Sequence, residues 1–259
     1  MQLSRILIYP IKSLDPLELR EAEVTALGAL RHDREWALID ERGSFVNGKS
    51  NPLVHRIRAR YSDDARQVTL SAGEGATETH ALDDAISLSA WFSQFFNEPI
   101  RLIRDEQQGF PDDLKANGPT LVGELSLVEV ASWFGLQRDD IRRRFRSNLE
   151  FEGAPMFWED RLFKKAGEFV EFRIGKLNLL GVNPCRRCAV PARDPDSGEI
   201  TSGFQKRFMQ ERERTLPPWA ERSHFDHFYR FAVNTRIAPG QLGKRIRIGD
   251  PVFLPGLKP

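Results

Sequence analysis

Short stretches in which apolar and polar side chains alternate run through the first hundred residues. In residues 56–61 three arginines alternate with Ile57, Ala59 and Tyr61, the pattern of a strand with one buried face. Polar turns that contain glycine separate such stretches from one another. Six strands are therefore predicted in this part of the chain, at residues 5–11, 20–26, 35–39, 57–61, 68–71 and 99–104.

Helical spacing of apolar side chains is confined to a few segments. Residues 84–96 are predicted to form one helix, and its buried face would carry Ile86, Leu88, Trp91 and Phe95. A second helix is predicted to begin at Ser126, because Glu129 follows three residues later and the pair fits a capping box. The remaining predicted elements are a short charged helix at 204–213 and strands at 145–151, 168–180 and 245–254.

A polar segment rich in Gly and Pro, DEQQGFPDDLKANGP at residues 105–119, is the candidate linker. It divides the chain into a mixed, β-rich N-terminal domain at 1–105 and a second domain at 106–259. Because the second part also has many strands and few helices, it is expected to form a β-barrel with short helices. The predicted fold class is therefore α+β and β-rich.

Composition and charge narrow the function classes. The 259 residues carry a net charge of +1, so no strong field attracts nucleic acid or an anionic membrane. No run of about 18 apolar residues is present, as a membrane-spanning helix requires. The first residues resemble a strand rather than a signal peptide, and two cysteines do not make a disulfide scaffold. We expect a cytoplasmic protein that binds neither nucleic acid nor membrane.

The two cysteines lie close together in NPCRRCAVPARDPDSGE, residues 183–199. One interpretation is a redox-active dithiol of the thioredoxin type, which would require a helix to begin at Cys185 and Cys188. Pro191 and the Asp194-Pro195 turn follow within ten residues and disfavour such a helix.

A second interpretation is a zinc site of the Cys2His2 type. Its ligands would be Cys185, Cys188, His224 and His227. The cysteines have suitable spacing, but two residues separate the histidines where three to five are usual.

A third interpretation is a single thiolate in an anion-binding pocket. Arg186, Arg187 and Arg193 flank the thiols, and nearby positive charge favours the thiolate. Thiolates are soft metal ligands, and arginine binds phosphate through paired hydrogen bonds. This combination suits a phosphorylated metal cofactor. An inert buried cysteine beside surface arginines is the simpler alternative.

Three further motifs place cationic side chains next to predicted strands. Lys12 follows the first strand in YPIKS, and Arg34 opens a strand in HDREW. RRRFRSN puts three arginines just before a strand and Arg146 within it, two residues before Asn148. Phe145 interrupts these arginines, so alternate side chains are expected to point inward. A solvated charge or a surface ion pair is the simpler explanation for each motif alone.

Taken together, these stretches resemble the MOSC family, named for the C-terminal domain of molybdenum cofactor sulfurase. YPIKSL and HDREWALID resemble the β-rich domain that precedes MOSC, and FRSN, NPCRRC, DPDSGE, FAVNTRI and IRIGDPVFL resemble MOSC itself. The resemblance covers nearly the whole chain and is greatest to the bacterial and mitochondrial amidoxime-reducing branch. Those proteins bind a pterin molybdenum cofactor and reduce N-hydroxylated compounds. The family is also associated with pyridoxal phosphate binding.

The resemblance implies roles for individual residues. Cys188 matches the cysteine that coordinates molybdenum, whereas Cys185 matches a variable position. Asp194 matches an acidic residue close to the metal and would belong to the catalytic site. The cofactor-binding positions implied are Lys12, Ser13, Arg34, Lys49, Arg146, Asn148 and Arg187.

The implied activity is oxygen-atom transfer from an N-hydroxylated or N-oxide small molecule. Two cysteines cannot ligate an iron–sulfur cluster that needs four, so electrons would come from a separate reductase or a ferredoxin-like protein. Residues 189–193 depart from the Thr-Thr-Val that eukaryotic relatives usually carry, which leaves the substrate open. The alternative function is a carrier of the cofactor, or of a persulfide on Cys188, without turnover of its own.

Overall fold

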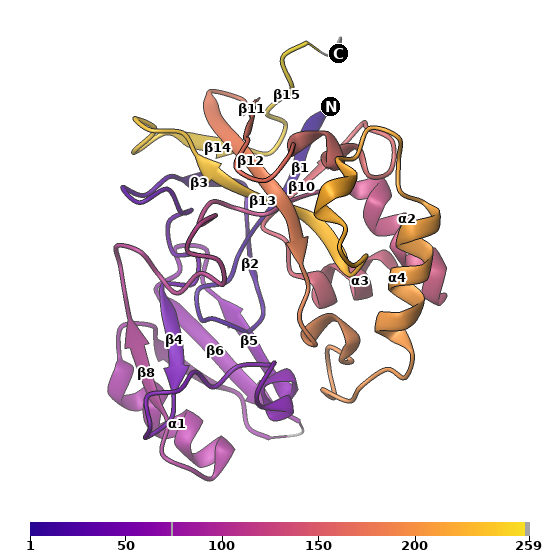
Figure 1. The fold of residues 1–259 in the computed structure, drawn as a ribbon. Coiled ribbons are helices and arrows are strands. Elements are labelled where there is room, and N and C mark those ends of the chain that lie inside the picture. The colour runs from indigo at the N-terminus through magenta and orange to yellow at the C-terminus, as the bar shows by residue number, and fades with distance from the viewer. Residues whose placement is uncertain (74, 257–259) are drawn as a thin grey trace.

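The structure is a computed structural model that describes residues 1–73 and 75–256 (Figure 1). Its first part contains β1 (Gln2–Ile8), β2 (Leu17–Leu19), β3 (Glu21–Glu23), β4 (Trp36–Ile39), η1 (Pro52–Arg56), β5 (Ile57–Tyr61), β6 (Gln67–Ala72), β7 (Glu78–Ala81), α1 (Ala85–Phe96) and β8 (Arg101–Arg104). Its second part contains β9 (Leu121–Gly123), α2 (Glu124–Phe134), α3 (Arg138–Phe145), β10 (Leu149–Glu152), η2 (Trp158–Leu162), β11 (Val170–Ile174), β12 (Leu177–Arg186), η3 (Val190–Ala192), α4 (Phe204–Arg214), η4 (Arg222–His224), β13 (Arg230–Ile237), β14 (Arg245–Arg247) and β15 (Val252–Phe253). The predicted α+β, strand-rich class is confirmed.

The largest sheet has eight strands in the order β15-β11-β12-β13-β9-β10-β1-β2. Its β15 end is joined back to the start of β1 by backbone hydrogen bonds, from Leu3 N–H to the Asp250 carbonyl (2.8 Å) and from Val252 N–H to the Met1 carbonyl (3.1 Å). The sheet therefore closes into a barrel, which removes free strand edges. Its interior is filled by aliphatic and aromatic side chains such as Phe151 and Phe172.

The barrel takes a strand from the N-terminal end of the chain. β1 pairs antiparallel with β10, with Ile6 opposite Leu149, and Leu3 is fully buried in the barrel core. The sheet thus crosses the predicted boundary between residues 105 and 106. That boundary stays a prediction, but the second part of the chain shares its core with the first.

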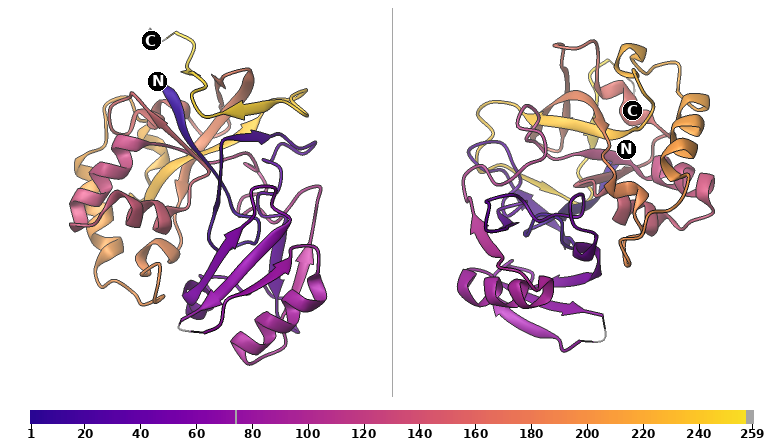
Figure 2. Two further views of the ribbon diagram at one scale, coloured as in Figure 1. Left: turned by 180° about the vertical axis from the view of Figure 1, so that it is seen from behind. Right: turned by 60° about the horizontal axis from the view of Figure 1, so that its bottom comes forward.

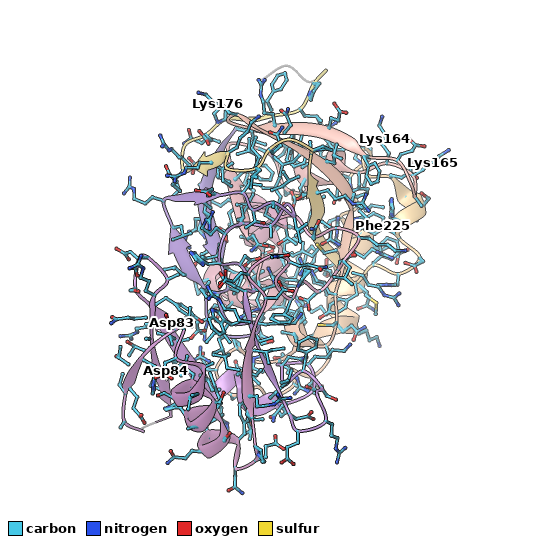
Figure 3. The ribbon with its side chains drawn as sticks, turned by 90° about the vertical axis from the view of Figure 1, so that its left-hand side faces the viewer. Asp83, Asp84, Lys164, Lys165, Lys176 and Phe225 are labelled. Carbon is cyan, nitrogen blue, oxygen red and sulfur yellow. The ribbon has the colours of Figure 1, made fainter. Side chains whose placement is uncertain are left out.

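A smaller unit lies below the barrel (Figures 1 and 2). It contains the β4–β8 pair, the three-stranded sheet β5-β6-β7 and α1, around a core of its own. Asp84 caps α1 by accepting the Ser87 N–H at 3.0 Å, and Figure 3 shows this residue at the opposite end of the molecule from Lys176. The predicted helix is confirmed, but Ile86 is 86% exposed and does not belong to its buried face.

Helices α2, α3 and α4 cover one side of the barrel (Figure 1). Phe145 and Phe208 pack there against Phe231 of β13, and Phe204 packs against Phe145. The predicted helix at 204–213 is confirmed as α4. No helix in the described ranges is long and apolar enough to cross a bilayer.

Three local predictions are wrong. α2 begins at Glu124 without a capping box, because Ser126 lies inside the helix and donates instead to Glu159 at 2.9 Å. The predicted strand 145–151 is divided: α3 ends at Phe145, and β10 begins at Leu149. The predicted strand 168–180 is a hairpin, in which Gly175 turns the chain with φ +55°.

Glu159 is a buried acid between α2 and the barrel. Burial, and then the neighbouring Asp160, raise the pKa of Glu159 to about 7 from a usual value of 4.5. The folded state therefore holds a proton that the unfolded state releases between these pH values. We expect stability from this proton to be fully present below pH 4.5 and to be lost as pH rises to about 7, by about 3 kcal/mol.

Urea unfolding between pH 4.5 and 8 measures this dependence. Glu159→Gln keeps the shape of the side chain without its charge, so the slope over that interval should flatten in the variant. Identical slopes for the wild type and the variant would show that Glu159 is not the group responsible.

Candidate functional site

A cavity of about 570 Å³ lies between the barrel and the smaller unit. Its wall comes from the loops after β1 and before β4, from residues 47–58, from residues 108–120, from the C-terminal end of α3 and from the end of β12. Segments distant in sequence thus meet at one site. The volume falls within the usual range for a small-molecule or cofactor pocket.

Cations outnumber carboxylates in the cavity wall. The lining cations are Lys12, Arg34, Lys49, Arg58, Arg142, Arg143, Arg144, Arg146, Arg186, Arg187 and Arg230. The lining carboxylates are Asp15, Asp33, Asp112 and Asp113. An excess of positive charge in a concave, partly buried site attracts an anionic ligand.

Arg34 and Arg146 lie against the ring of Tyr9. Their guanidinium carbons are 5.3 Å and 4.2 Å from its centroid, and burial raises the pKa of Tyr9 to about 12. Arg34 also pairs with Asp33 at 2.5 Å. Arg146 instead donates to the Leu14 carbonyl at 2.5 Å and has no carboxylate within ion-pair distance in the described part of the chain. Arg146 therefore leaves positive charge available to a ligand.

Three of the implied cofactor residues have left-handed backbone conformations. Ser13 has φ +76°, Arg34 has φ +54° and Arg146, which ends α3, has φ +56°. Non-glycine residues adopt this region at an energetic cost and do so preferentially at functional sites. The sequence prediction placed Arg146 within a strand, and its helix-terminal position is a correction.

Lys12 fastens the segment at 105–119 to the cavity wall. Its Nζ donates to the Phe110 carbonyl at 2.8 Å and pairs with Asp112 at 2.7 Å. Burial alone would raise the pKa of Asp112, but Arg34 and then Lys12 hold it below its usual value. The predicted linker is therefore part of the site, and several of its residues line the cavity.

Asn148 connects three segments of the wall. Its Oδ1 accepts from the N–H and hydroxyl of Thr120 at 3.1 and 3.2 Å and from Arg34 at 3.5 Å, and its Nδ2 donates to the Leu7 carbonyl at 3.0 Å. Asn148 is buried and has a partner for both side-chain atoms. It positions Arg34 and the cavity wall.

The two cysteines have different surroundings. Cys185, in β12, is buried and donates to Asn234 Oδ1 at 2.6 Å, and burial raises the pKa of its thiol. The β12–β13 register shifts between Pro184 and Arg186, next to this residue, and such bulges redirect side chains beside active sites. Cys188 follows the strand, lines the cavity and is exposed. Both cysteines line the cavity, and Cys188 is the more exposed of the two.

The remaining implied residues differ in how many hydrogen bonds their side chains already make within the protein. Arg187 donates through Nε, Nη1 and Nη2 to the carbonyls of Phe231 and Phe145, so its guanidinium braces the protein. Lys49 is exposed at the cavity, and Ser13 is half-buried in its wall.

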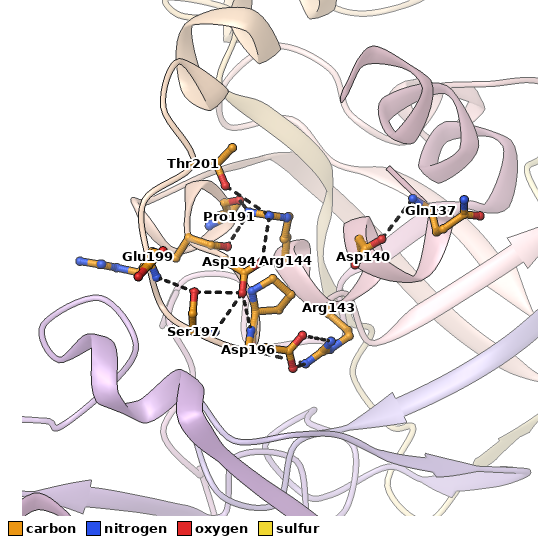
Figure 4. A network of polar contacts seen from close by, with 12 residues as sticks. Gln137, Asp140, Arg143, Arg144, Pro191, Asp194, Asp196, Ser197, Glu199 and Thr201 are labelled. Carbon is orange, nitrogen blue, oxygen red and sulfur yellow. Dashed lines mark hydrogen bonds and ion pairs between the residues drawn. The ribbon is translucent and has the colours of Figure 1, made fainter. Parts of the chain in front are cut away.

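Asp194 does not belong to the lining of the cavity. Its Oδ1 accepts the N–H of Asp196 and the N–H and hydroxyl of Ser197 at 2.9–3.1 Å (Figure 4). Burial alone would raise the pKa of Asp194, but the Ser197 and Asp196 amides hold it below its usual value. In this geometry Asp194 shapes the turn, and its predicted place beside the metal remains a prediction.

The zinc and dithiol interpretations are wrong for this structure. No group of three or more His, Cys, Asp or Glu side chains in the described residues is arranged to hold a metal ion. His224 is bonded to the Lys164 carbonyl, and the ring of Phe163 lies 5.4 Å from it. After Cys188 the chain forms the three-residue η3 and not the helix that a thioredoxin-like pair requires.

Sequence reasoning missed several lining residues. His55, Asn183 and Asn234 face the cavity, and burial followed by neighbouring arginines lowers the pKa of His55 despite its contact with the Gly48 carbonyl. No local pattern singles these residues out. They come from η1 and from the β12–β13 pair, elements distant in sequence that both contribute to the cavity wall.

Comparison with known proteins gives consistent matches along the chain. A family model described as the MOSC N-terminal beta barrel domain matches residues 1–110, and one described as the MOSC domain matches residues 121–253. Mitochondrial amidoxime-reducing component 1 of Mus musculus is 29% identical over 98% of this chain and 82% of its own length. The Homo sapiens protein of that name is 24% identical over the same shares.

Molybdenum cofactor sulfurase of Bos taurus is also similar, with 22% identity over 83% of this chain. The match spans 29% of that sulfurase. The relatives therefore include proteins named for two different activities.

Proposed function

The chain belongs to the MOSC domain family, and from that premise we propose that it is a molybdenum-cofactor-dependent reductase of N-hydroxylated or N-oxide compounds. The observation that carries the proposal is the exposed thiol of Cys188 in the wall of an arginine-rich cavity. The amidoxime-reducing relatives, at 24–29% identity, support the same reaction class.

The chemistry of the side chains fits a phosphorylated pterin that carries a soft metal. Arg146 has no carboxylate partner among the described residues and, with Arg34 and Lys12, would neutralise a phosphate through charge-assisted hydrogen bonds. Cys188 would supply a thiolate to the metal. When bound, the cofactor supplies two-electron oxygen-atom transfer.

The protein would contribute binding and orientation of the cofactor. Asn148 holds Arg34 in the wall, and Tyr9 packs under both Arg34 and Arg146, so the cationic surface is preorganised for an anion. Burial lowers the pKa of His55, which disfavours a further positive charge in the wall. Electrons would reach the site from a separate donor protein.

Turnover tests the proposal. Protein produced in a host that makes the molybdenum cofactor should reduce an aryl amidoxime to the amidine over many cycles with a viologen reductant. Protein from a host without cofactor synthesis is the control. Absence of turnover in protein that contains molybdenum would reject a reductase function.

The second candidate is a carrier of the cofactor or of a persulfide. The sulfurase relatives and the exposure of the Cys188 thiol favour it. A carrier would bind the cofactor, or release sulfide from Cys188 on treatment with dithiothreitol, and would show no more than one turnover in the amidoxime assay.

The charge of Arg146 is expected to matter more for cofactor retention than for folding. Loss of a hydrogen bond to a charged phosphate weakens binding by about 1.5–3 kcal/mol. We therefore expect Arg146→Met to bind the cofactor about tenfold or more weakly, measured as pterin retained after gel filtration. Arg207→Met, an equivalent change on the exposed face of α4, should retain the cofactor as the wild type does.

A further inference from the structure

Cys188 lies between two segments of the chain that arginine side chains hold in place. Before it, Arg187 is fixed by its bonds to the Phe231 and Phe145 carbonyls. After it begins the loop of residues 189–201, which contains η3 and the Asp-Pro turn and leads to α4. Backbone bonds inside this loop, such as Thr201 N–H to the Ala192 carbonyl at 2.8 Å, bring its two ends together.

Arg144, in the last turn of α3, holds both ends of this loop (Figure 4). Its Nη1 donates to the carbonyls of Pro191 at 3.1 Å and Arg193 at 2.5 Å, and its Nη2 donates to Thr201 Oγ1 at 3.3 Å. The guanidinium packs 5.1 Å from the ring of Phe204. One side chain thus ties α3 to the start and the end of the segment that follows the functional thiol.

The buried charge of Arg144 is not compensated by a close ion pair. Its side chain is 4% exposed, its nearest carboxylate oxygen, on Asp194, is 3.8 Å away, and its Nε has no hydrogen-bond partner among the described residues. Burial lowers the pKa of Arg144, which records the cost of holding a charge there. Removing one member of a close buried ion pair is strongly destabilising, but no carboxylate oxygen among the described residues lies closer than 3.8 Å to the Arg144 guanidinium.

The fork of the guanidinium explains why arginine occupies this position. It presents several donors in one plane and can reach two carbonyls and a hydroxyl at once, whereas a lysine ammonium is a compact point charge. The planar arrangement of the guanidinium donors, and not the positive charge alone, is therefore what holds the loop.

We propose that Arg144 is a positioning residue, which fixes the loop 189–201 and thereby sets the place of Cys188 in the cavity wall. The proposal rests on Cys188 as the functional thiol under the proposed function. It assigns to Arg144, which also lines the cavity, a role that is exerted through its contacts with the loop.

The first test uses full-length protein free of cofactor. Arg144→Met should speed hydrogen exchange of the amides in residues 189–201 by about tenfold or more, as loss of charge-assisted hydrogen bonds implies. Alkylation of Cys188 by iodoacetamide should change by about threefold or more, with buried Cys185 as the internal reference. Arg144→Lys should show the same changes, because it keeps the charge and loses the fork.

Two other arginines serve as comparisons for the urea unfolding midpoint. Arg207→Met on α4 should leave the midpoint and the loop exchange unchanged. Arg212 is also buried but pairs with the buried Asp160, so Arg212→Met should lower the midpoint clearly. The midpoint of Arg144→Met should fall less than that of Arg212→Met, because the variant leaves hydrogen-bond acceptors without a partner but no close buried carboxylate.

Three outcomes would overturn the proposal: unchanged loop exchange and Cys188 alkylation, wild-type behaviour in Arg144→Lys, or a midpoint lowered as far as in Arg212→Met. If Arg144→Met fails to fold, the Lys variant decides the question with the same readouts. With bound cofactor, kcat for the amidoxime should fall about tenfold or more while KM changes little. A wild type without turnover would reject the proposed function and leave the exchange and alkylation results to decide the role of Arg144.

Discussion

Cys188→Ser is expected to abolish amidoxime reduction while leaving the fold intact. The variant replaces a thiolate, a soft ligand, by a hydroxyl that stays protonated at neutral pH. Residues that merely support a metal ligand typically cost 10–100-fold when mutated, so loss of the ligand itself should lower kcat by more than about 100-fold. The side chain is exposed, so the urea midpoint should not move.

Single-turnover and steady-state assays with a viologen reductant measure the effect. Cys185→Ser is the matched control, because Cys185 is buried, has a raised pKa and donates to Asn234 through a bond that a hydroxyl can also make. It should keep most of its turnover. Retained activity in Cys188→Ser would reject this thiol as the ligand.

A fragment of residues 106–259 is expected not to fold on its own. It lacks β1, which lies between β10 and β2 in the sheet and bonds to the β14–β15 segment to close the barrel. Leu3, Ile6 and Ile8 are each fully buried in the barrel core. At about 1.5–3 kcal/mol each, their loss alone removes roughly 5–9 kcal/mol, comparable to the whole stability of a typical domain.

Circular dichroism and urea unfolding of the fragment test this expectation. The fragment should show no cooperative transition, and a circularly permuted chain that places residues 1–20 after a linker at the C-terminus of the fragment should recover one. A cooperative transition in the fragment alone would mean that the barrel does not need β1.

Some patterns that depend on local sequence correctly predicted the elements that the structure shows. Alternation located β5 at residues 57–61, and apolar spacing located α1, because a strand or helix with one buried face repeats its pattern along the chain. The position of Ile86 shows the limit of the method. Its spacing fits the helix, but the face that is buried depends on what packs against α1.

The sequence of α3 contains a charge pattern that would have predicted a helix. Asp139 and Asp140 occupy its first turn, and Arg142–Arg144 occupy its last, the order that the helix dipole favours. The aromatic Phe145 among the arginines was instead interpreted as strand alternation. The hairpin at 170–186 also had a turn signal in Gly175-Lys176.

Features that depend on distant pairing could not be read from the sequence. Nothing local shows that β1 closes the barrel, or that residues 108–118 fold into the cavity wall through Lys12. The motifs around Lys12, Arg34, Arg146 and Cys188 did predict residues that line one cavity. They could not predict that the Arg187 guanidinium donates to backbone carbonyls, or that the Asp194 carboxylate accepts hydrogen bonds within its own turn.

The central claim is that Cys188 and the arginine-rich cavity hold a molybdenum cofactor. Elemental analysis tests it most directly, on wild type and Cys188→Ser produced in parallel in a host that makes the cofactor. The account predicts close to one molybdenum per wild-type chain, and loss or altered coordination of the metal in the variant. Zinc in the wild type, without molybdenum or pterin, would contradict it.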